Sequence, residues 1–196
     1  LASGFPAGEG GGELYVEVTK QGGLVLEAIN SRSAGTATLS QEEAAALARD
    51  FLASRGYPSM RESYFIDQGG VITINFASVQ GDVLCYPDLV KVSVALDTGR
   101  VVGFESEGYL MNHMIRDLPA PAVTEAEAQA VVSPALTVLS HQLTVIPTGG
   151  EYEVLCHEFK CQDEDGRHVI VYVNAQNGQE EKILLLLENE NGTLVL

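Results

Sequence analysis

Apolar and polar side chains alternate over residues 91–104, KVSVALDTGRVVGF, in the pattern of a two-stranded hairpin. Over residues 92–97 each large apolar side chain is followed by a small or polar one, which is the period of a strand with one buried face. Gly99 then supplies the positive φ that a tight turn needs, and a second apolar strand begins at Val101. The pattern predicts a β-hairpin that covers a core with one of its faces.

The same hairpin pattern is found three times along the chain. Residues 16–26 and 171–183 repeat the alternating valines and place Gly23 and Gly178 where Gly99 stands in the first example. These glycines follow one another at intervals of 76 and 79 residues. A recurrent unit of this length is expected to be a small domain and not one turn of a solenoid.

A capped amphipathic helix is predicted before two of the three hairpins. Ser40 and Glu43 have the spacing of a capping box, Thr124 and Glu127 repeat it, and apolar residues follow each box at helical intervals. Pro134 is expected to kink the second helix or to split it in two.

The hairpin within residues 13–37 has no helix before it. The first copy is therefore expected to be incomplete because the chain begins inside a longer protein, and its hairpin is predicted to pair with a neighbouring sheet. A helix followed by an antiparallel meander is typical of an α+β fold. The expected organisation is a flexible tail (1–12), the incomplete copy (13–37), a complete unit (38–116), a Pro-rich linker (117–122) and a second complete unit (123–196).

The net charge disfavours some classes of binding partner. The 196 residues include 11 basic and 27 acidic side chains, for a formal net charge of −16, which makes nucleic acid and anionic membrane surfaces unfavourable partners. The charge fits an acidic solvated surface, or an acidic face that meets a basic protein. No apolar run approaches the roughly 18 residues of a membrane span.

The three cysteines are an odd number and define no disulfide framework. Cys85 and Cys156 both follow a leucine at equivalent places in the two complete units, so they are expected to be buried as small apolar side chains. A disulfide between Cys85 and Cys156 is the alternative in an oxidising compartment.

Candidate chemistry is sparse, and no catalytic motif, cofactor site or metal site is predicted. The densest group of metal-type ligands has the wrong spacing, because adjacent strand residues point to opposite faces. We expect instead a hairpin with Cys156 on its inner face and His157 on its outer face. The group consists of Cys156, His157, Cys161 and His168.

Other polar residues are interpreted as structural. Residues 163–166, DEDG, are predicted to form an acidic β-turn and not a calcium loop, because the later bidentate acid is missing. Glu105 and Glu107 are expected to share one face of a strand as solvated charges, unless burial shifts one of them for acid–base work. His113 and His141 are expected at the surface or at helix ends.

Four apolar residues gather where strands end and linkers begin. They are Tyr86, Tyr109, Leu110 and Met111. Aromatic and methionine side chains at such places often contact other domains or chains, but they also simply cover the ends of sheets. Both interpretations stay open from the sequence.

A capped helix followed by a meander that closes on V-x-V-x-x-x-x-G resembles the PepSY domain family. The stretch LCYPDLVKVSVALDTGRVVGFESEGYLMNH at residues 84–113 is similar to the PepSY repeats of a family of spore-germination proteins, and GYLMNH is its most specific part. The second unit agrees at SPAL (133–136), IP (146–147), LCHEF (155–159) and VNAQNGQEEKIL (173–184). His157 departs from the resemblance, since a tyrosine is expected there.

The resemblance implies a cystatin-like fold and a binding role without catalysis. The implied partner is a SleB-type spore cortex-lytic hydrolase, which the protein would stabilise or restrain until germination. The implied location is outside the cytoplasmic membrane, at the spore inner membrane and cortex, through an N-terminal anchor upstream of this chain. The alternatives are a self-associating structural module, with a homodimer possible, and an enzyme on a cystatin-like scaffold. The expected partner-binding residues are Tyr86, Asp88, Tyr109, Leu110, Met111, Asn112 and His113.

Overall fold

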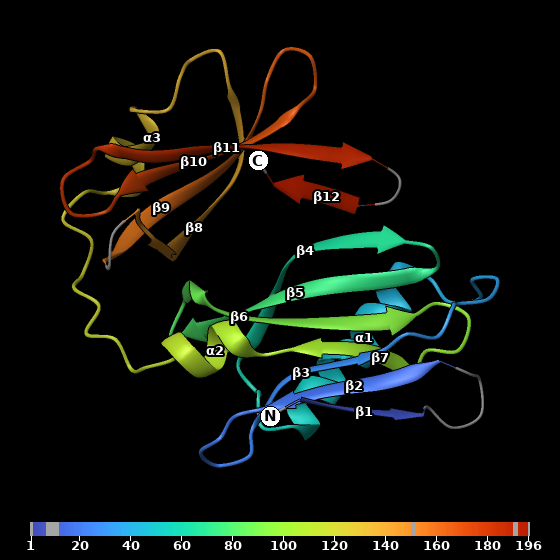
Figure 1. Ribbon diagram of the computed structural model, residues 1–196. Helices are drawn as coiled ribbons and strands as arrows, with labels where there is room; N and C mark the ends of the chain where they lie inside the picture. The colour runs from blue at the N-terminus through green and yellow to red at the C-terminus, as the bar shows by residue number, and fades with distance from the viewer. Residues whose placement is uncertain (1, 7–11, 150–151, 190–191, 196) are drawn as a thin grey trace. The chain divides into compact units, whose positions relative to one another are not determined.

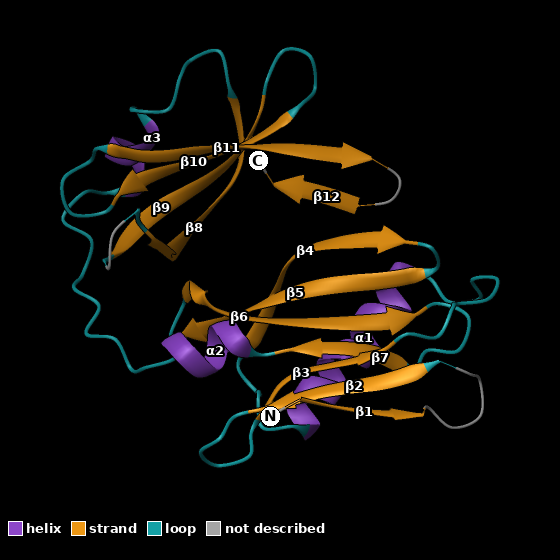
Figure 2. Cartoon of the chain, viewed as in Figure 1, coloured by secondary structure: helices purple, strands orange, loops and turns teal. Residues whose placement is uncertain are grey.

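The computed structural model describes residues 2–6, 12–149, 152–189 and 192–195 of the chain (Figure 1). The chain divides into two compact units. Unit 1 consists of Leu1–Ser78 and Asp88–His113, and unit 2 of Val79–Pro87 and Met114–Leu196. Strands outnumber helices in both units, and almost all strand pairs are antiparallel (Figure 2), which confirms the predicted α+β class.

Unit 1 is a sheet in the order β1-β2-β3-β7-β6-β5-β4 with two helices. Its elements are β1 (Ala2–Pro6), β2 (Glu13–Val18), β3 (Val25–Asn30), α1 (Gln41–Ser54), β4 (Met60–Gln68), β5 (Val71–Gln80), β6 (Val83–Ala95), β7 (Val101–Glu105) and α2 (Glu107–Asn112). The sequence predicted neither the helix α2 nor the full length of β6. Pro87 falls between the residues of β6 that pair with Thr144 and Val145 and those that pair with β7.

The helix α1 starts at the predicted capping box and covers one face of this sheet (Figure 2). Ser40 Oγ accepts a hydrogen bond from the Glu43 amide, while the Glu43 carboxylate accepts one from the Ser40 amide. Small and branched side chains on the inner stripe of α1 allow the close approach that burial requires. The core that they share with β5, β6 and β7 contains Ala44, Ala48, Leu52, Ile72, Ile74, Phe76, Val90, Val92, Val94 and Phe104.

All three predicted hairpins are present, as β2–β3, β6–β7 and β10–β11. Gly23, Gly99 and Gly178 have φ values of 64°, 69° and 73°, the left-handed conformation that the sequence pattern required. The first hairpin adds to the sheet of unit 1, because β3 pairs antiparallel with β7 through Ala28 and Phe104. This pairing confirms the prediction that the hairpin needs a neighbouring sheet.

The N-terminal residues differ from the flexible tail that was predicted over residues 1–12. Strand β1 pairs antiparallel with β2, from Ala2 opposite Glu17 to Pro6 opposite Glu13. Without β1 the backbone groups of β2 would form an open sheet edge, and pairing satisfies them. Residues 1 and 7–11 of the predicted tail lie outside the described residues.

Unit 2 repeats the helix-plus-meander plan with a shorter helix. Its elements are α3 (Glu125–Gln129), β8 (Thr137–Pro147), β9 (Glu153–Gln162), β10 (His168–Asn174), β11 (Glu180–Asn189) and β12 (Gly192–Val195), with the strands in the order β12-β11-β10-β9-β8. Leu84 and Cys85, at the start of β6, pair in parallel with Thr144 and Val145 of β8. The core beneath α3 contains Ala128, Val132, Phe159, Cys161, Val169, Val171 and Val173.

The second predicted helix is shorter than its apolar stripe implied. The capping box of Thr124 and Glu127 is present, but α3 ends at Gln129, and the structure has no second helix in the described residues 130–136. Pro134 has no amide hydrogen and a fixed φ, so the chain leaves the helix before reaching it. Val132 still reaches the core from the turn that follows α3.

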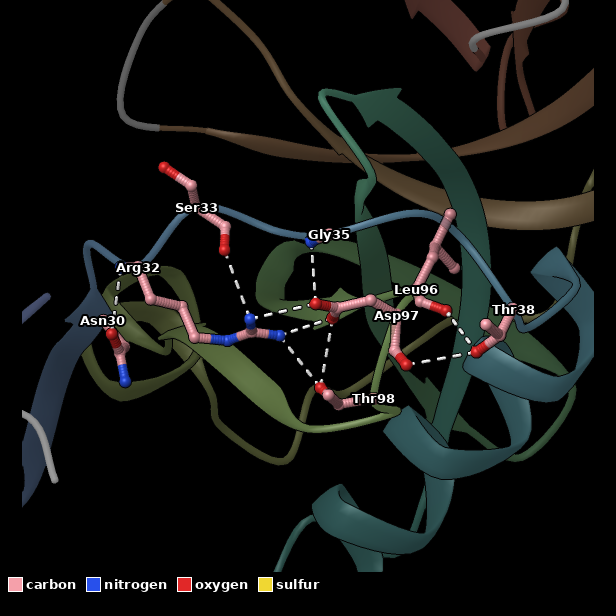
Figure 3. Close-up of polar contacts among 8 residues, drawn as sticks. All are labelled: Asn30, Arg32, Ser33, Gly35, Thr38, Leu96, Asp97 and Thr98. Atoms are coloured by element: carbon pink, nitrogen blue, oxygen red, sulfur yellow. Dashed lines mark hydrogen bonds and ion pairs between the residues drawn. The ribbon is translucent and has the colours of Figure 1, made fainter. Parts of the chain in front are cut away.

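A half-buried ion pair joins the loop after β3 to the turn between β6 and β7 (Figure 3). The Arg32 guanidinium donates to both carboxylate oxygens of Asp97, with Nη1 at 3.0 Å from Oδ2, and the Gly35 amide donates to Oδ2 at 2.7 Å. The Thr38 hydroxyl donates to the Asp97 carbonyl at 3.1 Å. The hydrogen bonds to the carboxylate, above all those from Arg32 and then that from the Gly35 amide, hold the pKa of Asp97 well below its usual value.

Removing the Asp97 carboxylate should loosen this loop. In Asp97→Ala we expect the thermal midpoint to fall at pH 7 and the amide of Gly35 to lose protection from exchange. Because the folded-state pKa is lowered, the stabilisation is present above the ordinary aspartate pKa of about 3.9 and is lost as the pH falls through the lowered value. The exposed Asp82, changed to asparagine, is the control for charge alone, and an unchanged midpoint in Asp97→Ala would contradict the prediction.

Candidate functional site

The helix α2 is fixed to the sheet at its first turn. Ser106, which precedes it, is buried; its hydroxyl donates to the Val25 carbonyl at 2.7 Å, and its amide donates to the Leu26 carbonyl at 2.8 Å. Tyr109 packs edge-on against Tyr57, with ring centroids 4.8 Å apart. These contacts hold α2 firmly against β3 and the end of α1.

The last residue of the helical turn is held by a buried carboxylate. Asp88 is fully buried, and its Oδ2 lies 2.7 Å from Nδ1 of His113. The His113 ring stacks on Tyr109 at 4.1 Å, and its amide donates to the Tyr109 carbonyl at 2.8 Å. Burial raises the pKa of Tyr109, and the charge of Asp88 adds to the shift. His113 is thus a helix-end residue, as predicted, with a partner 25 residues away that no local pattern indicated.

The chain that follows α2 carries exposed apolar side chains. Met111, Met114 and Ile115 are 73%, 59% and 82% exposed, and we call residues 111–115 the exposed apolar segment. The next residue, Arg116, is buried; its guanidinium binds Glu153, and its backbone amide donates to Gln80 Oε1 at 2.9 Å. His113 is thus held within unit 1 and Arg116 within unit 2.

The structure brings together six of the seven predicted partner-binding residues. Asp88, which is buried, Tyr109, which is half-buried, and His113 form the contacts described above, Leu110 is half-buried, and Met111 and Asn112 are exposed. Tyr86 belongs to unit 2, where it packs edge-on against Tyr172. The sequence interpretation missed Met114 and Ile115, although the run MNHMI contains three large apolar residues.

The prediction that His157 faces outward is wrong. Cys156 and His157 do point to opposite faces of β9, but both are buried, because the chain before α3 covers the face that carries His157. All three cysteines are buried and free, so no bridge joins Cys85 to Cys156. Burial, with the charges of Glu181 and Glu158, raises the pKa of the Cys156 thiol to about 12, so this thiol is unreactive at neutral pH.

A buried carboxylate lies on the Cys156 side of β9. Glu158 is 6% exposed, accepts a hydrogen bond from Gln142 Nε2 at 2.7 Å, and interacts with the hydroxyls of Tyr86 and Tyr172. Burial raises the pKa of Glu158 and outweighs these hydrogen bonds, and burial with the Glu158 charge also raises the pKa of Tyr172. No pattern in the sequence indicated that this acid is buried.

The other acidic candidates are structural. Glu105 and Glu107 do not share a strand face as predicted, because Glu105 ends β7, beside Lys91 Nζ at 2.8 Å, and Glu107 begins α2. Residues 163–166 form the predicted acidic turn, in which Asp163 Oδ1 accepts from the amides of Asp165 and Arg167. Within the described ranges, no three His, Cys, Asp or Glu side chains converge as a metal site.

The fold and the closing hairpins define a tandem PepSY protein. Residues 4–119 match the family model described as YpeB sporulation, PepSY1 and PepSY2 domains, and the chain belongs to this YpeB family. No helix among the described residues is long and apolar enough to cross a membrane.

Relatives agree along most of the chain. Sporulation protein YpeB from Halalkalibacterium halodurans is 36% identical over 180 residues, which is 90% of this chain, and the protein of that name from Bacillus subtilis is 33% identical over 87%. The match spans only 39% and 38% of those relatives. The solved Bacillus megaterium YpeB C-terminal domain superposes with a TM-score of 0.85 at 26% identity, covering 96% of this chain and 83% of that one.

Proposed function

We propose that this chain is a non-catalytic protein-binding module of a spore protein. It acts outside the cytoplasmic membrane and holds a SleB-type cortex-lytic hydrolase until germination. Support for a sporulation role comes from membership in the YpeB family, whose relatives carry the name sporulation protein. The observation that carries the binding role is the exposed apolar segment, residues 111–115.

Large apolar side chains on an exposed segment are typical of a protein contact. Met111, Met114 and Ile115 leave apolar area in water that burial against a partner would remove. Asp88 holds the His113 side chain within unit 1, and Glu153 and Gln80 hold Arg116 within unit 2. The net charge of −16 would favour encounter with a basic partner surface and add a dependence on salt.

The test is a binding measurement with the purified hydrolase. The full chain should form a complex by analytical ultracentrifugation and change the rate of cortex lysis. The double variant Met111→Asp/Ile115→Asp should weaken binding at least about tenfold, because it places charges in a desolvated contact. Leu139→Asp is the matched control, since Leu139 is also an exposed apolar residue but lies on β8.

Two results would count against the proposal. One is the absence of both a complex and an effect on lysis with the unmodified chain. The other is equal binding by the double variant and by Leu139→Asp, which would move the contact away from residues 111–115. A homodimer that forms without the hydrolase and is lost in the double variant would favour the self-associating module instead.

A further inference from the structure

Two histidines in unit 2 form a chain of polar contacts that ends at the start of α3. His157 on β9 is 3% exposed, and its Nε2 lies 2.9 Å from the Val123 carbonyl oxygen. Its Nδ1 lies 2.9 Å from Nε2 of His141 on β8. On the other side of the His141 ring, Nδ1 lies 3.3 Å from a carboxylate oxygen of Glu125 in α3. The chain therefore links β8, β9 and the first turn of α3.

The acceptors at the two ends fix where the protons lie. The Val123 carbonyl can only accept, so Nε2 of His157 carries a hydrogen, and in the neutral ring Nδ1 is then an acceptor. Nε2 of His141 must donate to that acceptor. Nδ1 of His141 faces a carboxylate, which favours a hydrogen there as well. Relative to two neutral rings, these contacts are compatible with one added proton on His141. They are not compatible with an added proton on Nδ1 of His157, which must accept from His141.

A second proton would set two donors against each other. With both rings charged, Nδ1–H of His157 and Nε2–H of His141 would point at one another across 2.9 Å. Like charges and opposed donors at that distance are strongly unfavourable in a site where His157 is buried. The contact between the rings then has to open.

Opening would release the residue that positions α3. The Val123 amide donates to the Ala175 carbonyl at 3.0 Å, and its carbonyl is held by His157, so this residue is fixed from both sides. Thr124 directly follows it and forms the capping box. Through Ala128, α3 covers the buried side chains of Phe159 and Cys161. Loss of the contacts that hold Val123 would therefore weaken the packing of α3 on this core.

We propose that the His141–His157 pair is a pH-sensitive latch that holds the start of α3 on the sheet and opens when both rings are protonated. The groups that face the pair are Glu125 from α3, the uncharged ring of Phe159 from β9 and Val173 from β10, opposite His157. On β8, the neighbours of His141 are the uncharged Ser140 and Gln142. Glu125 is the one carboxylate that contacts either ring within the described residues.

The direction of the pH effect follows from the site. Burial lowers the pKa of His141, Glu125 opposes this shift, and His157 adds to it. A histidine whose folded-state pKa is lowered gives stability that is present above its ordinary pKa of about 6.5 and is lost as the pH falls. The lowered pKa keeps His141 uncharged and the latch closed at neutral pH, and the latch opens only under acid conditions that protonate both rings.

Hydrogen exchange at the two helix starts tests the latch in the full chain. The amides of Glu127 and Ala128 report on α3, and those of Glu43 and Ala44 report on α1, which has the same capping box without histidines. Between about pH 7 and pH 5 the protection factors in α3 should fall about tenfold relative to those in α1, the effect of losing one hydrogen bond in a buried network. Equal changes in the two helices would overturn the proposal.

Substitutions separate the latch from general acid sensitivity. In His141→Gln the side-chain amide can turn to accept from a protonated His157, so the relative loss of protection in α3 should disappear. His168→Gln removes a histidine of β10, outside the pair, and should leave that loss unchanged. Nitrogen chemical shifts of labelled imidazoles give a direct measurement, with the Nε2–H form expected for neutral His157. An Nδ1–H form at pH 7, or a persistent loss in His141→Gln, would contradict the latch.

Discussion

Gly103→Ala is expected to lower the free energy of unfolding by about 2–3 kcal/mol, and the second change Ser93→Gly should recover most of that loss. Gly103 lies in β7 opposite Ser93 of β6 and Ile29 of β3. A Cβ at Gly103 would lie 2.8 Å from the Ser93 Cβ and 2.7 Å from its hydroxyl oxygen. Both are close to the backbone, so relief requires β6 and β7 to separate.

The double variant restores the space by moving the side chain to the other strand. Ser93→Gly alone should destabilise by about 1 kcal/mol, since it adds glycine flexibility to a strand and removes the hydrogen bond, 2.8 Å long, between Ser93 and Thr73. In the presence of Gly103→Ala the same change should instead stabilise. Urea unfolding of the four proteins measures this coupling directly.

Gly149→Ala is the control for glycine replacement itself. Its added Cβ would meet no atom within 4 Å, so the unfolding midpoint should stay the same within error. If the two changes in the free energy of unfolding simply add in the double variant, the close approach of β6 and β7 is not the reason that residue 103 is a glycine.

The hairpins and capping boxes could be predicted because their determinants lie within a few residues of one another. A turn glycine such as Gly99, or a pair such as Ser40 and Glu43, acts on the backbone beside it. No pattern near residue 103 predicts a glycine there, because the side chain that would clash with a Cβ is Ser93 on the neighbouring strand. Local patterns therefore predicted the elements, while contacts across the sheet determined individual positions within them.

The candidate site depended more on remote contacts than the hairpins did. Asp88 and His113 meet across 25 residues, and the carbonyl that covers His157 is 34 residues earlier in the chain. A histidine in a strand of alternating pattern is predicted to face outward unless the segment that covers it is known. The segment that covers His157 includes Val123, which no local pattern places there. The same limit applies to Glu158, whose burial follows from the packing of Tyr86 and Tyr172.

Glu158→Gln is expected to raise the free energy of unfolding by about 1–2 kcal/mol at pH 7, because it removes a buried charge and keeps the shape of the side chain. The glutamine carbonyl can accept from Gln142 Nε2, as the carboxylate does at 2.7 Å, and its amide can donate to the tyrosine hydroxyls. Lys160 contributes the favourable charge that partly stabilises the carboxylate. Glu158→Gln loses the attraction to Lys160, but it also removes the larger desolvation penalty of the buried carboxylate.

The pH profile distinguishes removal of a buried charge from a general packing effect. Burial raises the folded-state pKa of Glu158, so the folded protein binds this proton more tightly than the unfolded chain does. The resulting stabilisation is fully present below the ordinary glutamate pKa of about 4.3 and is lost as the pH rises through the raised value. Glu158→Gln should therefore match the unmodified protein near pH 4 and exceed it increasingly towards pH 7. Glu164→Gln, in the exposed turn, makes the same change of charge and should give no such divergence. A gain in Glu158→Gln that is constant over this pH range would indicate a packing effect and not the removal of a buried charge.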